Sequence, residues 1–352
     1  MSVIQRLLRS AGMGKGIGGG IGKDMAVGHQ VTPFISAYPW TPGVGFGVKY
    51  ANPATLPANA VDGVAFCGST DIAVAIRVTA PFVSAYPWTP GVGFGVKYAD
   101  PATLPASGGY DVAFCGATDI AVGHDNTPWV SAYPWTSGVG FGVKYANPVT
   151  LPTGAGEGVA FCGSTDIAVA HQFTPFISAY PWTPGAGFGA KYADPATKPA
   201  SHGRDIAFCG ATDIAVGHST TPFISAYPWT PGVGFGVKYA NPATLPTGTG
   251  SGVAFCGSTD IAVAHTTAPN VSAYPWTPGV GFGVKYANPA TLPAGVNSWA
   301  VAFCGATDIA VGHDNNPRVS AYPWTPGAGF GAKYADPATL PTGTGSGVAF
   351  RN

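Results

Sequence analysis

Residues 158–200 read GVAFCGSTDIAVAHQFTPFISAYPWTPGAGFGAKYADPATKPA, and this stretch decides the fold because close copies of it fill most of the chain. Its tripeptide Tyr-Pro-Trp recurs, and the tryptophans stand at positions 40, 88, 135, 182, 229, 276 and 324. Neighbouring tryptophans are 47 or 48 residues apart, which divides the chain into seven units. A period of roughly 20–50 residues indicates a solenoid, a propeller or another array.

Each unit contains four short runs with the composition of β-strands. In the quoted unit we expect strands over 159–161, 166–171, 176–182 and 188–192, where β-branched, aromatic and alternating apolar residues gather. Thr174-Pro175 and a Pro-Gly loop separate these runs, and no unit holds a helical pattern of about 10–12 residues. The sequence therefore predicts an all-β chain folded as a seven-bladed β-propeller with four-stranded blades.

The two ends of the chain complement each other. The first unit lacks the Val-Ala-Phe run and begins at Asp24, whereas the last such run, 348–350, stands alone near the C-terminus. We expect the N- and C-terminal strands to share one blade, because this pairing closes the ring and removes two exposed sheet edges. The predicted domains are an N-terminal arm over residues 1–23, with a Gly-rich linker, and a propeller over residues 24–352.

The run Val-Ala-Phe-Cys-Gly-Ser-Thr-Asp-Ile-Ala-Val-Ala at 159–170 resembles the first two strands of WD40-like propellers, and the resemblance extends over residues 24–352. No unit combines a Gly-His with a Trp-Asp dipeptide as that family does, so its structural hydrogen-bond tetrad is not carried over. Near-identical blades also resemble recently amplified repeats of bacteria and tailed phages. Cys-Gly-Ser-Thr units alternate with Cys-Gly-Ala-Thr units, which indicates that a two-blade block was copied.

The composition excludes several classes of protein. Sixteen basic and sixteen acidic side chains give net charge 0, so a polybasic nucleic-acid binder is excluded. With 52 Gly and 34 Pro the chain is turn-rich, but 46% hydrophobic and 12% aromatic residues are too many for a disordered chain. No apolar stretch of about 18 residues is present, so we expect no membrane span.

Four polar residue types recur once in nearly every unit. We expect the cysteines to be reduced and half-buried and the histidines to make a structural hydrogen bond at a strand end, with a metal-binding or pH-responsive ring as the alternative. We expect the aspartates and lysines to form rim pairs or turn caps.

Paired catalytic carboxylates need unlike environments, whereas each repeat presents the same lone aspartate. The sequence therefore predicts no catalytic residue, no metal site, no cofactor and no enzyme. The positions are Cys67, Cys115, Cys162, Cys209, Cys256, Cys304; His29, His124, His171, His218, His265, His313; Asp24, Asp71, Asp119, Asp166, Asp213, Asp260, Asp308; and Lys49, Lys97, Lys144, Lys191, Lys238, Lys285, Lys333.

The N-terminal arm lies outside the repeat. It combines apolar residues at helical spacing with basic residues and has no acidic residue before Asp24. We expect the arm to dock into a partner, with a solvated tail as the alternative. It is too short and interrupted for a signal peptide, which suggests a cytoplasmic or virion-associated protein. The predicted partner-binding residues of the arm are Val3, Ile4, Arg6, Leu7, Leu8 and Arg9.

The seven copies differ mainly in two loops that up-and-down blade topology places on one face. Between the second and third strands stand Arg77, Trp129 and Arg318, and before the first strand stand Arg204 and Trp299. Exposed arginines and aromatic residues are the types that anchor interfaces, so we predict that these five bind a partner, with neutral drift of loops as the alternative. Asp62, Tyr110, Glu157 and His202 belong to the same variable positions.

These observations predict a non-enzymatic structural or interaction propeller, held by its arm in a larger assembly such as a phage particle, with protein partners. The alternative is a multivalent, lectin-like propeller that binds glycans on aromatic pockets formed by Tyr-Pro-Trp. An enzyme would instead need one polar cluster that breaks the symmetry of the repeats.

Overall fold

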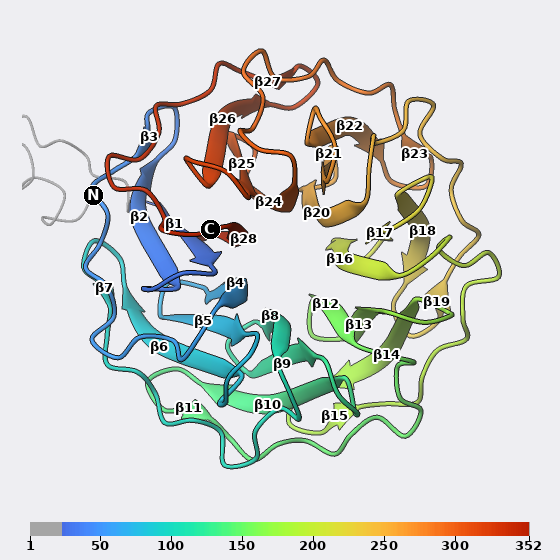
Figure 1. Cartoon of the computed structure of the whole chain (residues 1–352). Coiled ribbons are helices and arrows are strands. Elements are labelled where there is room, and N and C mark those ends of the chain that lie inside the picture. Colours follow the sequence, from blue (N-terminus) through green and yellow to red (C-terminus); the bar gives the residue numbers. More distant parts are fainter. Residues whose placement is uncertain (1–22, 352) are drawn as a thin grey trace, which may run out of the picture.

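The computed structural model describes residues 23–351, which form 28 β-strands in seven four-stranded antiparallel sheets. The sheets stand around a central channel as the blades of a propeller (Figure 1). The all-β, seven-bladed prediction is confirmed. Among the described residues no helix is long and apolar enough to cross a membrane. Residues 1–22, which hold most of the predicted arm, lie outside the described residues, and Lys23 is the first residue of β1.

Each blade has an inner, a second, a third and an outer strand. The inner strands line the channel: β4 Val61–Cys67, β8 Gly109–Cys115, β12 Gly156–Cys162, β16 Gly203–Cys209, β20 Gly250–Cys256, β24 Ser298–Cys304 and β28 Gly345–Arg351. The second strands are β1 Lys23–His29, β5 Asp71–Ile76, β9 Asp119–His124, β13 Asp166–His171, β17 Asp213–His218, β21 Asp260–His265 and β25 Asp308–His313.

The third and outer strands complete the blades. The third strands are β2 Ile35–Thr41, β6 Val83–Thr89, β10 Val130–Thr136, β14 Ile177–Thr183, β18 Ile224–Thr230, β22 Val271–Thr277 and β26 Val319–Thr325. The outer strands have two residues each: β3 Gly45–Phe46, β7 Gly93–Phe94, β11 Gly140–Phe141, β15 Gly187–Phe188, β19 Gly234–Phe235, β23 Gly281–Phe282 and β27 Gly329–Phe330.

The ring closes through a blade built from both ends of the chain. Its strand order is β28-β1-β2-β3, with Met25 opposite Phe350 and Val27 opposite Val348. This confirms the shared closing blade. It pairs the first and last described strands, so neither leaves an open sheet edge.

Two strand boundaries differ from the sequence-based expectation by more than one residue. The inner strand β12 begins at Gly156 and not at Val159, because a bulge between Gly156 and Gly158 interrupts the alternation of side chains. The outer strand β15 ends at Phe188, although a strand was expected over 188–192. The ladder stops where Gly189 packs on Pro181, and a Cβ at Gly189 would stand 2.9 Å from the Cβ of Pro181.

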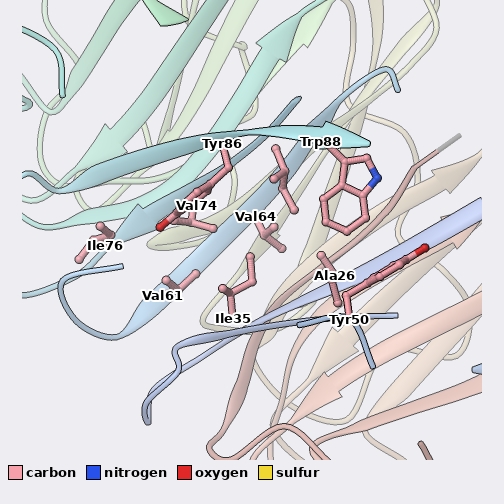
Figure 2. Packing of buried hydrophobic residues seen from close by; sticks show 11 residues of the cluster. Ala26, Ile35, Tyr50, Val61, Val64, Val74, Ile76, Tyr86 and Trp88 are labelled. Carbon is pink, nitrogen blue, oxygen red and sulfur yellow. The ribbon is translucent and has the colours of Figure 1, made fainter. Parts of the chain in front are cut away.

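The hydrophobic core lies between blades. In one interface Ala26 of the closing blade packs with Tyr86 and Trp88 of the next blade (Figure 2). Ala37 and Ile72 belong to the same cluster. Trp88 meets the rings of neighbouring aromatic residues edge to face, with centroids about 5 Å apart. The small residues of the second and third strands leave the room that these aromatic rings fill.

The antiparallel register gives the propeller two unlike faces. One, which we call the turn face, carries the turns that follow the inner strands (67–70 and its equivalents) and the third strands (41–44 and its equivalents). The other, which we call the loop face, carries the loops between second and third strands and the first residues of the inner strands. The copies are nearly identical on the turn face and differ on the loop face.

Candidate functional site

The repeated aspartates are buried just beneath the turn face. Asp119 accepts hydrogen bonds from Thr118 Oγ1 at 2.8 Å, from the Tyr145 hydroxyl at 2.5 Å and from Trp182 Nε1 of the next blade at 3.3 Å. The rim-pair prediction is therefore wrong, because the lysines contact the side chain three residues later, as Lys144 contacts Asn147. The aspartate ring holds blades together and is not available to a substrate.

The repeated histidines lie beneath the loop face. His171 Nε2 and Ser178 Oγ are hydrogen-bonded at 2.9 Å, and both side chains are buried. Burial lowers the pKa of His171 to about 4, so the imidazole is neutral at pH 7. The expected structural hydrogen bond is confirmed. In one blade Ile76 takes the place of the histidine. Ser84 Oγ of that blade has no hydrogen-bond partner among residues 23–351.

The six cysteines are free and buried. The thiol of Cys67 lies 3.2 Å from the carbonyl oxygen of Gly116 in the next blade, and the same contact recurs around the channel. Burial raises the pKa of Cys67 to about 11, which keeps the thiol protonated and unreactive. Within residues 23–351 no group of three or more His, Cys, Asp or Glu side chains has a geometry that could hold a metal ion.

The symmetry is broken at a cavity of about 390 Å³ on the loop face. The second residue of each inner strand lines this mouth of the channel, and six different residue types occupy the seven positions: Ser346, Asp62, Tyr110, Glu157, Arg204, Ser251 and Trp299. Arg77, from the loop after β5, lines the same cavity. The cavity is thus an asymmetric polar cluster of the kind that an enzyme would need.

Asp62 is the most unusual acid of this cavity. Its Oδ2 lies 3.4 Å from the Arg77 guanidinium, whereas its buried Oδ1 has no hydrogen-bond partner among the residues described. Burial raises the pKa of Asp62 to about 6, although the positive charge of Arg77 opposes this rise. The Arg77 guanidinium also stacks on Tyr110, 5.6 Å from the ring centroid. The carboxyl therefore titrates near neutral pH and has one unoccupied acceptor.

A second charged group lies on the neighbouring inner strands. Glu157 accepts from Arg204 Nη1 at 2.8 Å and lies 2.7 Å from His202 Nε2, and Arg204 Nε also donates to Ser219 at 3.1 Å. These contacts fix the direction of the Arg204 guanidinium. Arg204 is only partly buried, so it remains open to an anionic group in the cavity.

Two further carboxyls tie inner strands together. Asp111 accepts the backbone N–H of Val112 at 2.8 Å and that of Val159 in the next blade at 2.9 Å. Asp205 repeats the arrangement with Val253, at 2.7 Å. Burial raises the pKa of both carboxyls. They line the cavity, but their oxygens already accept backbone hydrogen bonds, so we assign them a positioning role.

The structure places the predicted partner-binding residues in three locations. Arg77, Arg204 and Trp299 meet at the cavity. Trp129 and Arg318 lie away from it, at equivalent loop positions of different blades, each half-buried with φ near +70°. The arm residues lie outside the described part of the chain. Contact with a partner through any of these residues stays a prediction.

Sequence reasoning misplaced some cavity residues and missed others. Asp62, Tyr110, Glu157, Arg204 and Trp299 were expected in loops but are strand residues, since the inner strands begin earlier than expected. The cavity-lining residues Gln30, Asp111, Asp205, Ser251 and Ser346 were not predicted. A signal was present for two of these, because Asp111 and Asp205 replace the glycine found at the same place in other copies.

No protein-family model matches the chain, and no curated protein matches it in sequence. Among solved structures it is similar to a "putative 6-phosphogluconolactonase" of Bacteroides fragilis, with a TM-score of 0.72 and 12% identity over 95% of this chain and 99% of the other. One of Bacteroides uniformis matches with a TM-score of 0.69 and 11% identity over 94% and 99%. The WD40 β-propeller domain of Doa1 matches with a TM-score of 0.55 and 10% identity over 85% and 87%.

These neighbours confirm the WD40-like propeller fold and correct two predictions. The chain was expected to be no enzyme, and to be a structural or interaction propeller with a lectin as the alternative; propellers named as lactonases overturn both expectations. The repeated aspartate is the same in every blade, but Asp62 and Glu157 are acids that are not repeated. The lectin pockets fail too, because the Tyr-Pro-Trp tryptophans are buried. At 11–12% identity the likeness shows the fold alone, so the activity is a proposal.

Proposed function

We propose that the chain is a hydrolase that opens a small cyclic ester in the loop-face cavity, with Asp62 as general base. The observation that carries this proposal is the state of the Asp62 carboxyl. One oxygen is held near Arg77, the other has no hydrogen-bond partner within residues 23–351, and the pKa is raised to about 6. Such a carboxyl is largely ionised at pH 7 and is a stronger base than an ordinary aspartate.

The chemistry follows from this arrangement. Asp62 takes a proton from a water molecule while the water oxygen adds to the ester carbonyl carbon. The negative charge that develops on the carbonyl oxygen is stabilised by a guanidinium, for which Arg77 and Arg204 are the two candidates on the cavity wall. The ring C–O bond then breaks, and the proton passes from Asp62 to the leaving oxygen, which gives a hydroxy acid.

The size and lining of the cavity support a polar, sugar-sized substrate. A volume of about 390 Å³ lies at the small end of the range for ligand pockets, about 300–1,000 Å³. Trp299 is 39% exposed at the cavity and offers an apolar ring face, and two arginines offer donors to oxygen-rich groups. The lactonase name of the two Bacteroides neighbours supports the choice of a cyclic ester.

The test is a hydrolysis assay of the purified full chain on glucono-δ-lactone and its 6-phosphate, followed by acid release at constant pH. We expect turnover above the spontaneous rate, rising with pH through about 6 as Asp62 ionises. D62N should lower kcat/KM by about 10²–10⁴-fold.

The matched control is D125N, because Asp125 is an exposed acid in a loop of the same face but does not line the cavity. This variant should keep the wild-type rate. Absence of turnover on both lactones, or a D62N variant as active as D125N, would refute the proposal. Calorimetric unfolding of each variant separates loss of chemistry from loss of fold.

A further inference from the structure

The third residue of each inner strand alternates around the ring between glycine and a residue with a side chain. In order from β4 these residues are Gly63, Asp111, Gly158, Asp205, Gly252, Ala300 and Gly347. The glycines are required by packing, because a Cβ at Gly158 would stand 2.8 Å from the Cα of Asp205, and one at Gly252 would stand 2.9 Å from the Cα of Ala300. Asp111, Asp205 and Ala300 therefore form one series, set on every second inner strand.

Two members of this series hold a carboxylate between neighbouring inner strands. Asp111 accepts the N–H of Val112 in its own strand and the N–H of Val159 in the next blade. Asp205 accepts the N–H of Ile206 at 2.7 Å and that of Val253 in the next blade at 2.7 Å. Two backbone N–H groups from adjacent inner strands thus form a binding site for one carboxylate.

The third member offers the same pair of donors without the carboxylate. Val301 and Val348 have the register of Val112 in the ladders with their second strands. Because N–H groups point alternately to either side of a strand, those of Val301 and Val348 point away from these ladders, as that of Val112 does. Ala300 has no acceptor to offer them, and no side chain among the described residues accepts from either N–H. Both valines are buried, where an unpaired N–H is costly.

This donor pair opens into the loop-face cavity. Ala300, Val301 and Val348 all line the cavity, and the adjacent Trp299 offers a half-exposed ring face beside them. The two cavity acids that stand second in their strands are each paired with an arginine, so their charges are partly offset for an anion that enters. A ligand in the cavity can therefore reach the two N–H groups.

We propose that the N–H groups of Val301 and Val348 bind the carboxylate of a small hydroxy acid, such as a sugar acid. Its two oxygens would take the place that the Asp111 and Asp205 carboxylates take elsewhere in the ring. Its hydroxyl groups suit a cavity whose walls carry arginines and acids. The hydroxy acid formed by the proposed hydrolase is one such ligand, but binding depends on this N–H pair and not on the chemistry of Asp62.

The experiment is isothermal titration calorimetry of the full chain at pH 7.5 with gluconate, with sorbitol, which has hydroxyls but no carboxylate, and with inorganic phosphate. We expect gluconate to bind, and sorbitol and phosphate to bind more weakly by about tenfold or more. The variant A300D should lose about tenfold or more in affinity for gluconate, because its own carboxylate accepts both N–H groups. Its Tm should be no lower than that of the wild type.

The matched control is S251D, which adds an acid to the same cavity from β20 but leaves the N–H pair of Val301 and Val348 free. It should bind gluconate nearly as the wild type does. The converse variant is D205A, which frees the N–H groups of Ile206 and Val253 and should raise the number of bound gluconates from one to two. Ala300 shows that alanine is accommodated at this position of an inner strand.

Four results would overturn the proposal: no binding of gluconate, equal binding of gluconate and sorbitol, tighter binding of phosphate, or equal affinity for gluconate in folded A300D and S251D. If A300D does not fold, an unchanged number of bound gluconates in D205A would overturn it as well. Turnover of a lactone without gluconate binding would remove this inference and leave the hydrolase. Gluconate binding without turnover would remove the hydrolase and leave the carboxylate site.

Discussion

The two faces of the propeller cover similar buried layers but differ in what lies above them. Beneath the turn face is a ring of aspartates, each bound by a tyrosine of its own repeat, and in most blades also by a tryptophan of the next. Beneath the loop face is a ring of histidines bound to serines. Above the aspartates the turns are almost the same in every copy, whereas above the histidines the loops and strand ends differ. Repeated positions hold the blades together, and unrepeated positions create the cavity.

This comparison separates stability from function within one chain. A change in a buried repeated layer removes an interaction between or within blades and should reduce stability. A change on the loop-face surface touches few buried partners and should alter the cavity while leaving the fold intact.

The histidine layer should make the fold sensitive to acid. Burial lowers the pKa of the six ring histidines to about 4 from an ordinary 6.5. Between these values the unfolded chain binds protons that the folded chain does not, so stability present above pH 6.5 is lost as the pH falls toward 4. We expect the folded state to become less stable and to unfold cooperatively as the pH falls through this range. The measurement is the Tm by circular dichroism at pH 7.5, 6, 5 and 4.5, which should fall with pH.

Three acids of the cavity have the opposite effect on stability as the pH falls, but the six histidines outnumber them. The pKa values of Asp62, Asp111 and Asp205 are raised by burial, so their protonation favours the folded state as the pH falls below about 6. The variant H171Q keeps a polar partner for Ser178 without a titrating group and should lose less Tm on acidification than the wild type. A Tm that stays constant or rises from pH 7.5 to 4.5 would contradict the prediction.

The two faces can be compared by the same substitution at Arg351 and Arg204. Arg351 Nε lies 2.6 Å from Asp24, and both side chains are almost completely buried at the closing blade. Removing one partner of a buried pair costs about 3–5 kcal/mol, because the other charge is left unpaired. R351M should therefore lower the free energy of unfolding by about that amount, as measured by urea denaturation.

R204M is the counterpart on the loop face. Arg204 is 38% exposed and pairs with Glu157 at the cavity, so its loss should cost at most about 1 kcal/mol. It should, however, weaken substrate binding or turnover if the cavity is the active site. Equal destabilisation by R351M and R204M would show that the two faces do not differ in the way we infer.

Most of the fold could be predicted from the sequence because the same four-strand pattern is repeated in seven units. The second strand was placed correctly over Asp166–His171, since its apolar residues alternate without a break. The start of the inner strand was missed because Gly156 and Gly158 offer no side-chain pattern and enclose a bulge. The outer strand was expected to be longer than β15, because the sequence does not show that Gly189 packs on Pro181.

The cavity could be predicted only in part. Comparing the copies singled out Asp62, Tyr110, Glu157 and Arg204 as unlike their counterparts, but not that ring closure brings them to one mouth. Their convergence depends on contacts between residues roughly 47 positions apart, and the raised pKa of Asp62 depends on burial. Both are tertiary properties, so the comparison of copies predicted partner binding for Arg204 and no chemical role for any of the four residues.

The smallest expected effect comes from repairing the one defect in the histidine layer. Ile76 stands where six blades have histidine, and Ser84 Oγ lacks the hydrogen bond that its equivalents make. I76H should restore that bond and raise the free energy of unfolding at pH 7.5 by about 1 kcal/mol, measured by urea denaturation. The gain should shrink below pH 6.5, because the new histidine is itself buried. I76Q, which offers a hydrogen-bonding group but no titration, serves as control and should give a gain that does not change with pH. A loss of stability in I76H at pH 7.5 would mean that the loop above this blade has repacked around isoleucine, and that the layers under the variable face are less uniform than those under the turn face.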